Sequence, residues 1–436
     1  MRYLSFIKNS VANRILLWNF PLVLSAVIYF GQRKMWKLIN PIQPYCWGSK
    51  TALTRLFGIE NPTNQPMAEL WMGAHPQGSS QLNINGETLT LERFIQREPE
   101  QLLGRPLSGE AASLPFLFKV LSAEQALSIQ VHPDKAAAEQ GFREETQRGI
   151  PLDAAERNYK DDNHKPELLY ALTPFQGMNG FRPLAEIAAL LAPFADTAAP
   201  FHTFITSPDE AQLRQLLGWL LTLPQQPLQQ VLKQLERLSQ ASQQPPWPTV
   251  RTLLADFPGD IGAIMPLLLN LIALQPGEAM FLSPGTPHAY LQGCGLEVMA
   301  NSDNVLRAGL TCKHIDSQQL LAHTRFTSLR QNEWRVRPCI VDGEVRFPVP
   351  VDDFSLAILS LGNSGHHLQQ SGPLILFCIK GKAICQSGRI ILRLLPGESL
   401  FVAAADRPVT IYGHGEIAIA GGGTDNFTTR VSSQNQ

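Results

Sequence analysis

A short pattern occurs twice in the second half of the chain and limits its fold more than any other feature. Residues 274–281 (LQPGEAMF) and 394–401 (LLPGESLF) both place Pro-Gly-Glu between an apolar residue and a short apolar run. A tight turn that leads into a strand in this way is typical of jelly-roll β-barrels. Because the pattern is repeated, we predict two related barrels in a mainly β chain.

The first third of the chain also has the character of β-structure, with short alternating runs broken by glycine, proline and asparagine. Its clearest strands are expected at residues 115–122 (PFLFKVLS) and 126–133 (ALSIQVHP). We therefore expect a first barrel built from residues 35–183 and 262–330. A second, C-terminal barrel is expected at residues 331–436.

Between residues 184 and 261 the apolar spacing is helical, which predicts a helical domain inserted into the first barrel. The sequence Ser-Pro-Asp-Glu at 207–210 predicts a capping box, with Ser207 as the N-cap and Pro208 at the first helical position. Apolar residues at helical spacing follow, and we interpret them as core-facing stripes. They are Leu213, Leu216, Leu217 and Leu220, and then Leu228, Val231, Leu232, Leu235 and Leu238.

The first 34 residues have a character of their own. The apolar run at 15–31 follows basic residues and resembles a signal peptide or a short membrane anchor. However, Asn19 and Pro21 interrupt it, and no small-residue cleavage site follows. Met35 begins a segment that reads as a natural protein start. We therefore interpret residues 1–34 as a non-native or disordered extension from a misplaced start codon; an anchor and an extra helix are the alternatives.

Charge and cysteine usage exclude several classes of partner. The 36 Lys and Arg residues nearly balance the 37 Asp and Glu residues, so no basic excess points to nucleic acid. The six cysteines are scattered without a CxxC pair, which fits a reducing compartment rather than a disulfide framework. We expect a cytoplasmic protein without nucleic-acid or membrane partners.

Polar and apolar side chains alternate along residues 126–133. Ser128, Gln130 and His132 should therefore share one face of this strand. A buried polar face needs partners, and a metal ion bound by the Gln130 amide oxygen and the His132 imidazole would satisfy it. A structural turn that contains a buried glutamine is the alternative.

Two further motifs each contribute one possible metal ligand. In residues 163–170 (NHKPELLY), Glu167 enters an apolar strand on the same face as Lys165, and a surface Lys–Glu pair is the alternative. In residues 283–290 (SPGTPHAY), two prolines and a glycine fix the chain just before His288, for which a structural role is equally open.

Taken together, these motifs supply one amide oxygen, two imidazoles and one carboxylate, from Gln130, His132, Glu167 and His288. Nitrogen and oxygen ligands without a thiolate suit a catalytic zinc ion with an open coordination position. At the offset where the first repeat has His288, the second has Pro408. We therefore predict one metal site, in the first barrel, and a structural role for the second.

Four cationic residues lie in otherwise apolar segments of the sequence: Lys119, Lys165, Arg307 and Lys313. Beside a metal ion they would favour an anionic substrate such as a phosphate ester. Taken alone, each such cation is more often a solvated or paired charge.

At this level of detail the chain resembles class I mannose-6-phosphate isomerases, and the enterobacterial members in particular. The resemblance rests on SIQVHPDK, NYKDDNHKPELLYAL, PGTPHAYL and LEVMANSDNVLRAGLT, supported by WGSKTAL and AELWMGAHP. It extends from about Met35 to the C-terminus, and residues 1–34 lie outside it. It implies a catalytic cupin (jelly-roll) barrel, a helical domain and a second, C-terminal cupin barrel.

The resemblance also implies roles for individual residues. It places the zinc ligands at Gln130, His132, Glu167 and His288, and the active residue at Arg307. It also implies a set of residues that line the substrate pocket. They are Lys119, Ser128, Lys165, Glu297 and Lys313.

The implied reaction interconverts mannose 6-phosphate and fructose 6-phosphate through a cis-enediol organised by one zinc ion, in mannose catabolism or GDP-mannose synthesis. The proton carrier is left open between Glu297, a zinc-bound water and His288. We expect a monomer whose partner is a small sugar phosphate. The alternatives are another metal-dependent sugar isomerase or epimerase on this scaffold, an iron dioxygenase, a non-catalytic sugar-binding cupin and a membrane-anchored protein.

Overall fold

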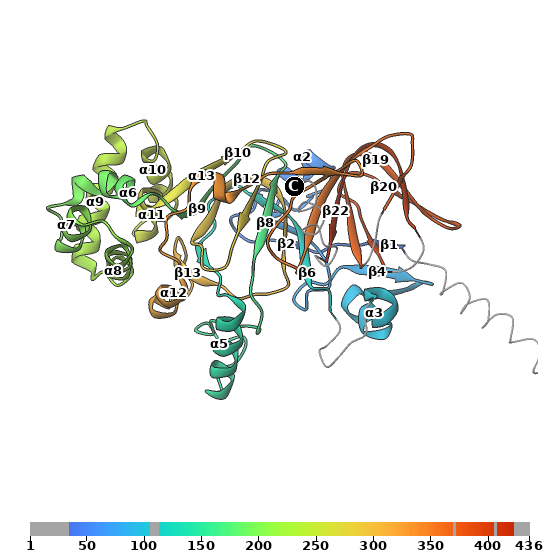
Figure 1. Cartoon of the computed structure of the whole chain (residues 1–436), viewed down its shortest axis with the longest axis horizontal. Helices are drawn as coiled ribbons and strands as arrows, with labels where there is room; N and C mark the ends of the chain where they lie inside the picture. Colours follow the sequence, from blue (N-terminus) through green and yellow to red (C-terminus); the bar gives the residue numbers. More distant parts are fainter. Residues whose placement is uncertain (1–34, 105–112, 369–371, 405–407, 423–436) are drawn as a thin grey trace, which may run out of the picture.

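The computed structural model describes residues 35–104, 113–368, 372–404 and 408–422. The predicted extension at residues 1–34 lies outside them. Figure 1 shows two β-sheet units side by side, with a group of helices at the far end of the first unit. This arrangement confirms the mainly β class with a helical insertion. None of the helices in the described part of the chain combines the length and apolar character that a membrane span needs.

The first sheet unit is antiparallel and centres on the long strand β12 (His288–Ala300). One end of β12 pairs with β8 and β6, and the other end pairs with β7 and β9. The sheet order is β14-β11-β8-β12-β6-β3-β2, with β13 on β7 and β10 on β9. Their bounds are β2 (Ile42–Gln43), β3 (Glu69–Met72), β6 (Phe116–Ala123), β7 (Ile129–Val131), β8 (Glu167–Ala171), β9 (Phe175–Phe181), β10 (Leu269–Leu274), β11 (Ala279–Leu282), β13 (Leu306–Gly309) and β14 (Arg335–Val336).

The second sheet unit has the order β1-β21-β19-β22-β17-β16-β15, with β18 on β22 and β20 on β19. Its strand β1 (Met35–Leu38) comes from the other end of the described chain and pairs with β21. The segment 35–183 therefore does not lie wholly in the first unit. The other bounds are β15 (Cys339–Val341), β16 (Glu344–Arg346), β17 (Ser355–Leu361), β18 (His366–His367), β19 (Leu374–Ser387), β20 (Ile390–Leu394), β21 (Ser399–Val402) and β22 (Thr410–Gly421).

The repeated Pro-Gly-Glu pattern forms the same turn in both units. The Glu278 carboxylate accepts a hydrogen bond from the Gln275 N–H at 2.8 Å. In the second copy the Glu398 carboxylate accepts one from the Leu395 N–H at 2.7 Å. The glycine of each turn has a positive φ, 95° and 82°, which a residue with a Cβ rarely adopts. The internal repeat is therefore structural as well as sequential.

A continuous apolar core joins the two units. Phe377 of β19 is fully buried and contacts the rings of Phe57 and Phe118 at centroid distances of 5.2 and 6.3 Å. Alternate residues of β6, β8 and β12 face this core, as a sheet covered on one side requires. Their partners from the second unit include Leu356, Ile358, Ile375, Phe401 and Ala418.

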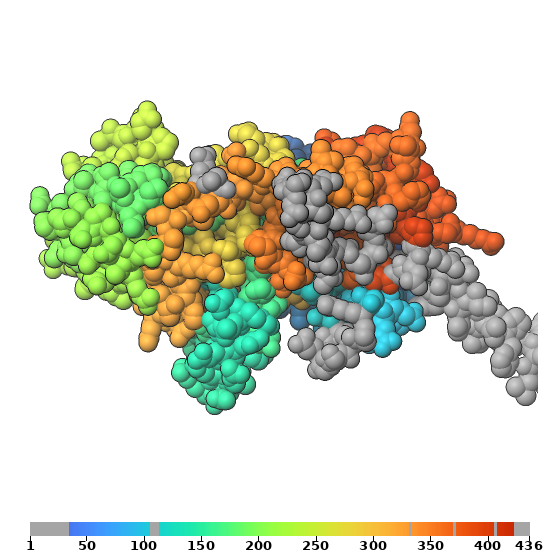
Figure 2. Space-filling view, in the orientation of Figure 1, coloured from blue at the N-terminus to red at the C-terminus, as the bar shows by residue number. Residues whose placement is uncertain are grey.

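The helical insertion forms the end of the molecule farthest from the second sheet (Figures 1 and 2). Its helices are α6 (Leu184–Leu191), α7 (Ala199–Thr206), α8 (Glu210–Leu221), α9 (Gln225–Ala241) and α10 (Trp247–Asp256). The four leucines predicted on α8 are buried, as are Val231, Leu232 and Leu235 of α9. The predicted capping box was wrong: Asp209 is the N-cap, and its side chain accepts from the Gln212 N–H. Ser207 and Pro208 precede the helix, because the aspartate two residues after Ser207 provides the cap.

Helix α5 (Lys135–Gln147) projects from the first unit as a separate lobe (Figures 1 and 2). This helix was not predicted, because only Ala138, Gly141 and Glu145 are buried and no apolar stripe marks it. The remaining elements are short: α2 (Ala52–Phe57), β4 (Gln81–Ile84), β5 (Glu87–Thr90), α3 (Leu91–Arg97), α4 (Pro99–Leu103), η1 (Ala192–Phe194), η2 (Ile261–Ile264), α11 (Met265–Leu268), α12 (Ser317–His323) and α13 (Gln331–Trp334).

Candidate active site

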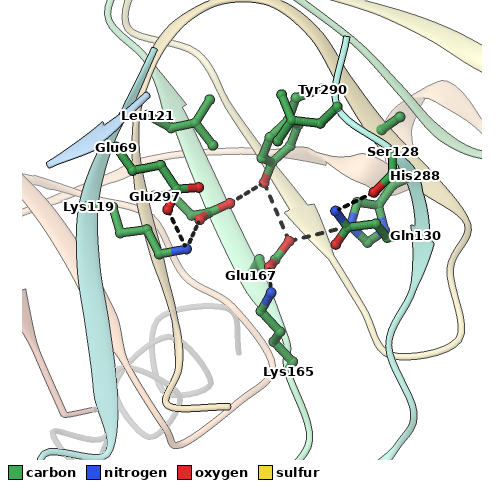
Figure 3. A pocket seen from close by; sticks show the side chains of 12 residues that line it. Glu69, Lys119, Leu121, Ser128, Gln130, Lys165, Glu167, His288, Tyr290 and Glu297 are labelled. Carbon is green, nitrogen blue, oxygen red and sulfur yellow. Dashed lines mark hydrogen bonds and ion pairs between the residues drawn. The ribbon is translucent and has the colours of Figure 1, made fainter. Parts of the chain in front are cut away.

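Strand alternation directs a set of charged side chains into the first unit. On β6 and β12 the residues next to Lys119 and Glu297 face the core between the two units, so these two charges face the opposite way. The same alternation turns Glu69 on β3 and Glu167 on β8 to that face. All four side chains line one pocket (Figure 3). The other lining residues are Leu121, Leu127, Ser128, Gln130, Lys165, His288, Ala289 and Tyr290.

Lys119 lies between two carboxylates. The register places Lys119 opposite Glu297 on one side and Trp71 on the other. Its Nζ is 3.0 Å from a Glu297 carboxylate oxygen and 3.7 Å from Oε2 of Glu69. Burial alone would lower the pKa of Lys119, but Glu297 and Glu69 outweigh burial and raise it. Lys119 is therefore a buried ammonium group whose charge is already balanced by protein groups.

Tyr290 joins the two halves of the pocket. Its hydroxyl donates to Oε1 of Glu297 at 2.6 Å and lies 3.5 Å from Oε2 of Glu167. Burial and then the Glu297 charge raise the pKa of Tyr290, so the hydroxyl keeps its proton. Burial also raises the pKa of Glu297, although Lys119 opposes it.

His132, directly after β7, converges with Glu167 of β8 and His288 of β12 on one point, and all three side chains are buried. Nε2 of His132 is 3.4 Å from Oε1 of Glu167, and Nε2 of His288 is 3.4 Å from Oε2. The far side of each ring is held by a backbone carbonyl. Nδ1 of His132 is 2.7 Å from the Asn304 oxygen, and Nδ1 of His288 is 2.9 Å from the Thr286 oxygen.

These contacts favour the same tautomer in both rings. A carbonyl can only accept, so each Nδ1 carries the proton and the Nε2 of a neutral ring presents a lone pair. Burial and then the charge of Lys165 lower the pKa of His132 to about 4, so this ring is neutral near pH 7. Its Nε2 is buried without a hydrogen-bond partner among the described residues. Imidazole lone pairs directed at a carboxylate repel it, and a cation between them would turn the repulsion into binding.

Gln130 lies at the edge of this cluster. On β7 it is in register with His288 of β12 on one side and with Arg307 of β13 on the other. Side chains directly opposite in antiparallel strands share a face, so the three form one row. The Gln130 amide nitrogen donates to Ser128 Oγ at 3.2 Å, which leaves its oxygen to face the cluster (Figure 3).

The other predicted cations have different surroundings. Lys165 is 3.1 Å from Oε1 of Glu167 and lines the pocket. Arg307 is partly buried and in register with Gln130, and burial lowers its pKa. Lys313 is exposed beyond the end of β13 and is not among the residues that line the pocket. The structure therefore brings Lys119 and Lys165 into the pocket, places Arg307 beside it, and leaves Lys313 outside.

Sequence reasoning missed Glu69 and Tyr290 as site residues. Glu69 accepts a hydrogen bond from Trp71 Nε1 at 2.6 Å, and both side chains face the pocket side of β3. The alternation Glu-Leu-Trp-Met at 69–72 is the signal that predicts this, provided that β3 is known to be an inner strand. Tyr290 follows His288 by two residues, so the same rule puts it on the face of a predicted ligand.

Two family models and several named proteins match this chain. Residues 35–184 match the family model "Phosphomannose isomerase type I, catalytic domain", and residues 343–420 match "Mannose-6-phosphate isomerase, cupin domain". Mannose-6-phosphate isomerase of Escherichia coli (strain K12) is 50% identical over 385 residues, which cover 88% of this chain and 98% of that protein. The Mus musculus enzyme of the same name is 34% identical, covering 83% and 92%.

Solved structures agree as well. A crystal structure of a variant of phosphomannose isomerase from Salmonella typhimurium matches with a TM-score of 0.87 at 48% identity, covering 89% of this chain and 100% of that one. A zinc-bound structure of mannose 6-phosphate isomerase matches with a TM-score of 0.86 at 48% identity and the same coverage. The chain therefore belongs to the type I phosphomannose isomerase family.

Proposed function

We propose that the chain catalyses the reversible isomerisation of mannose 6-phosphate and fructose 6-phosphate with one bound zinc ion. The observation that carries the proposal is the convergence of two imidazole nitrogens and one carboxylate beside a charged pocket. Family membership supports the reaction, and the zinc-bound relative supports the identity of the metal. The nitrogen and oxygen donors suit zinc. Nε2 of His132 is buried without a hydrogen-bond partner among the described residues, as expected for a nitrogen that binds a metal.

Gln130, His132, Glu167 and His288 would hold the metal. The three carboxylates of the pocket, on Glu69, Glu167 and Glu297, face the ammonium groups of Lys119 and Lys165. A cation at the histidines would therefore reduce an excess of negative charge. When bound, the ion would act as a Lewis acid that polarises the sugar carbonyl and orients the carbonyl oxygen and the neighbouring hydroxyl oxygen.

Aldose–ketose isomerisation requires a base for the proton on the carbon next to the carbonyl. We assign this role to Glu297, because His288 faces Glu167 and is committed to the metal cluster. The raised pKa of Glu297 makes it a stronger base than an ordinary carboxylate, which general base catalysis near neutrality favours. Tyr290 and Lys119 hold its two oxygens in place.

The substrate's negative charges require separate cations. Lys119 is balanced by Glu297 and Glu69, so we assign it to orienting the base rather than to binding phosphate. In our proposal Arg307, in register with Gln130, stabilises the negative charge that develops on the enediolate. Lys165 and Ser128 line the pocket and are proposed to contact the sugar phosphate. Lys313, beyond the lining, is proposed to attract the anionic substrate, and a monomer remains our expectation.

The decisive experiment combines metal analysis with a substrate panel. The purified chain should contain about one zinc per chain, lose isomerase activity on chelation and regain it when zinc is restored. Full activity in the metal-free protein would refute the zinc assignment. Glucose 6-phosphate and free mannose serve as comparison substrates. Higher turnover of a different sugar phosphate would favour the alternative, another isomerase or epimerase on the same scaffold.

A further inference from the structure

The two candidate histidine ligands are oriented in different ways. The carbonyl that accepts from His288 belongs to Thr286, only two residues earlier in the same turn. The carbonyl that accepts from His132 belongs to Asn304, far along the chain in the segment between β12 and β13. The orientation of His132 therefore depends on how firmly that remote segment is fixed.

The Asn304 side chain fixes it from within. The residue is fully buried, and its Nδ2 donates to the backbone oxygens of Asp161 and Asn163, both at 2.8 Å. Its Oδ1 accepts from the Lys160 N–H at 2.7 Å. The Asn304 side chain thus links its own segment to residues 160–163, and both its amide nitrogen and its amide oxygen are hydrogen-bonded.

The Asp161 carboxylate also holds the segment that carries Asn304. It accepts from Ser302 Oγ at 2.7 Å and from the Asp303 N–H at 2.7 Å. It also accepts from the Asn163 N–H at 2.9 Å. Bonds to a partly buried carboxylate are stronger than neutral ones, so the turn that carries the Asn304 carbonyl has little freedom to move.

We propose that Asp161 and Asn304 are positioning residues that hold the His132 ring so that Nε2 points at the metal site. The inference rests on the proposed function, because it concerns the same metal. The network acts through the Asn304 carbonyl, which fixes the tautomer and the rotation of the ring. It also anchors Asn163, which shortly precedes Lys165 and Glu167. The same network therefore fixes the segment that leads to Glu167 and the carbonyl that orients His132.

The test measures zinc affinity by competition with a chromogenic chelator, in the full chain. Asn304→Ala and Asp161→Asn should each weaken zinc binding about 10- to 100-fold, the usual effect of losing a group that orients a ligand. Ser302→Ala removes one bond to Asp161 and should weaken it less. Glu344→Gln is the matched control, because Glu344 is also a buried, hydrogen-bonded carboxylate but lies in the second sheet. Its affinity should equal that of the wild type.

A second readout separates positioning from folding. Excess zinc should restore most of the turnover of Asn304→Ala, and its Co²⁺ form should show an altered visible absorption spectrum. Wild-type affinity in the Asn304 and Asp161 variants would overturn the inference while leaving the proposed function intact. Failure of the wild type to bind zinc would overturn the proposed function instead. If Asn304→Ala and Asp161→Asn do not fold, unchanged affinity in Ser302→Ala refutes the inference and weakened affinity supports it.

Discussion

Replacing Lys119 with methionine tests whether this residue balances carboxylates or binds phosphate. Its Nζ lies 3.0 Å from Glu297, and the exposed fractions of the two side chains are only 8% and 3%. At this separation the attraction is about 5 kcal/mol for an effective dielectric constant near 20. Methionine keeps most of the side-chain volume and avoids the desolvation cost of the lysine. Because Glu297 and Glu69 are left without their cation, we expect a net loss of about 3–5 kcal/mol in unfolding free energy.

The chain offers a control pair with almost the same geometry and different burial. Lys37 and Glu398 are 2.8 Å apart, but their side chains are 43% and 39% exposed. Lys37→Met should lower the unfolding free energy by no more than about 1 kcal/mol, because water screens exposed pairs. Urea unfolding near neutral pH at a fixed zinc concentration compares the two variants directly.

A double variant isolates the interaction itself. In Lys119→Met with Glu297→Gln, one unpaired charge disappears, so the combined loss should fall short of the sum of the single losses by about 2 kcal/mol. A Lys119→Met variant as stable as Lys37→Met would refute the charge-balance argument. If that variant also showed a raised KM and an unchanged kcat, Lys119 would be a phosphate ligand instead.

Three other outcomes follow from the structure. Arg307→Ala should lower kcat about 10²- to 10³-fold and leave the urea midpoint nearly unchanged; an unchanged rate removes Arg307 from the mechanism. Metal-free protein should lose stability as the pH falls from about 6.5 to about 4, because the pKa of His132 is lower in the folded than in the unfolded state. A urea midpoint that does not fall across this range contradicts that shift. Asp209→Ala should cost about 1 kcal/mol through loss of the N-cap, whereas Ser207→Ala should cost almost nothing, and equal thermal shifts would refute the assignment.

The sequence predicted those parts of the fold where a local period coincides with burial. Strand β6 follows the predicted segment at 115–122 closely, and the leucines of α8 lie at the predicted spacing. Helix α5 was missed because it projects from the body and buries few apolar residues. The pairing of β1 with β21 was also missed. A four-residue strand carries no local sign of which distant sheet it joins.

In the candidate site, too, local patterns were predictive and long-range contacts were not. Alternation put Gln130 and His132 on one face, and the motifs added Glu167 and His288, which lie in the same cluster or line the same pocket. Alternation could not show that Lys119 lies between two carboxylates, because that depends on the register of β3, β6 and β12. An isolated cation in an apolar strand looks the same whether its partner is a substrate or a protein group.

The repeated turns allow the two sheets to be aligned residue by residue. The Gly277 N–H donates to the oxygen of Ala171 at 2.9 Å, and the Gly397 N–H donates to that of Cys378 at 3.0 Å. Ala171 therefore corresponds to Cys378. Four residues earlier, Leu374 in the second sheet takes the place of Glu167.

Strand register extends this alignment to the other charges of the pocket. Leu374 pairs with Gly421 as Glu167 pairs with Met299, so Ile419 takes the place of Glu297. The partner of Ile419 is Ala357, where the first sheet has Lys119. The three replacements are buried in one apolar cluster.

The comparison explains why the charges of the first unit occur together. An isolated buried charge costs several kcal/mol. Glu167, Glu297 or Lys119 alone would therefore destabilise an otherwise apolar interior. The charges of the first unit therefore form one interdependent set, and the candidate cation site belongs to that set. Glu167 is the link, because it contacts both candidate histidines, Lys165 and the Tyr290 hydroxyl that leads to Glu297. With Leu374 in its place, the second unit has no carboxylate at the position from which Glu167 contacts both histidines.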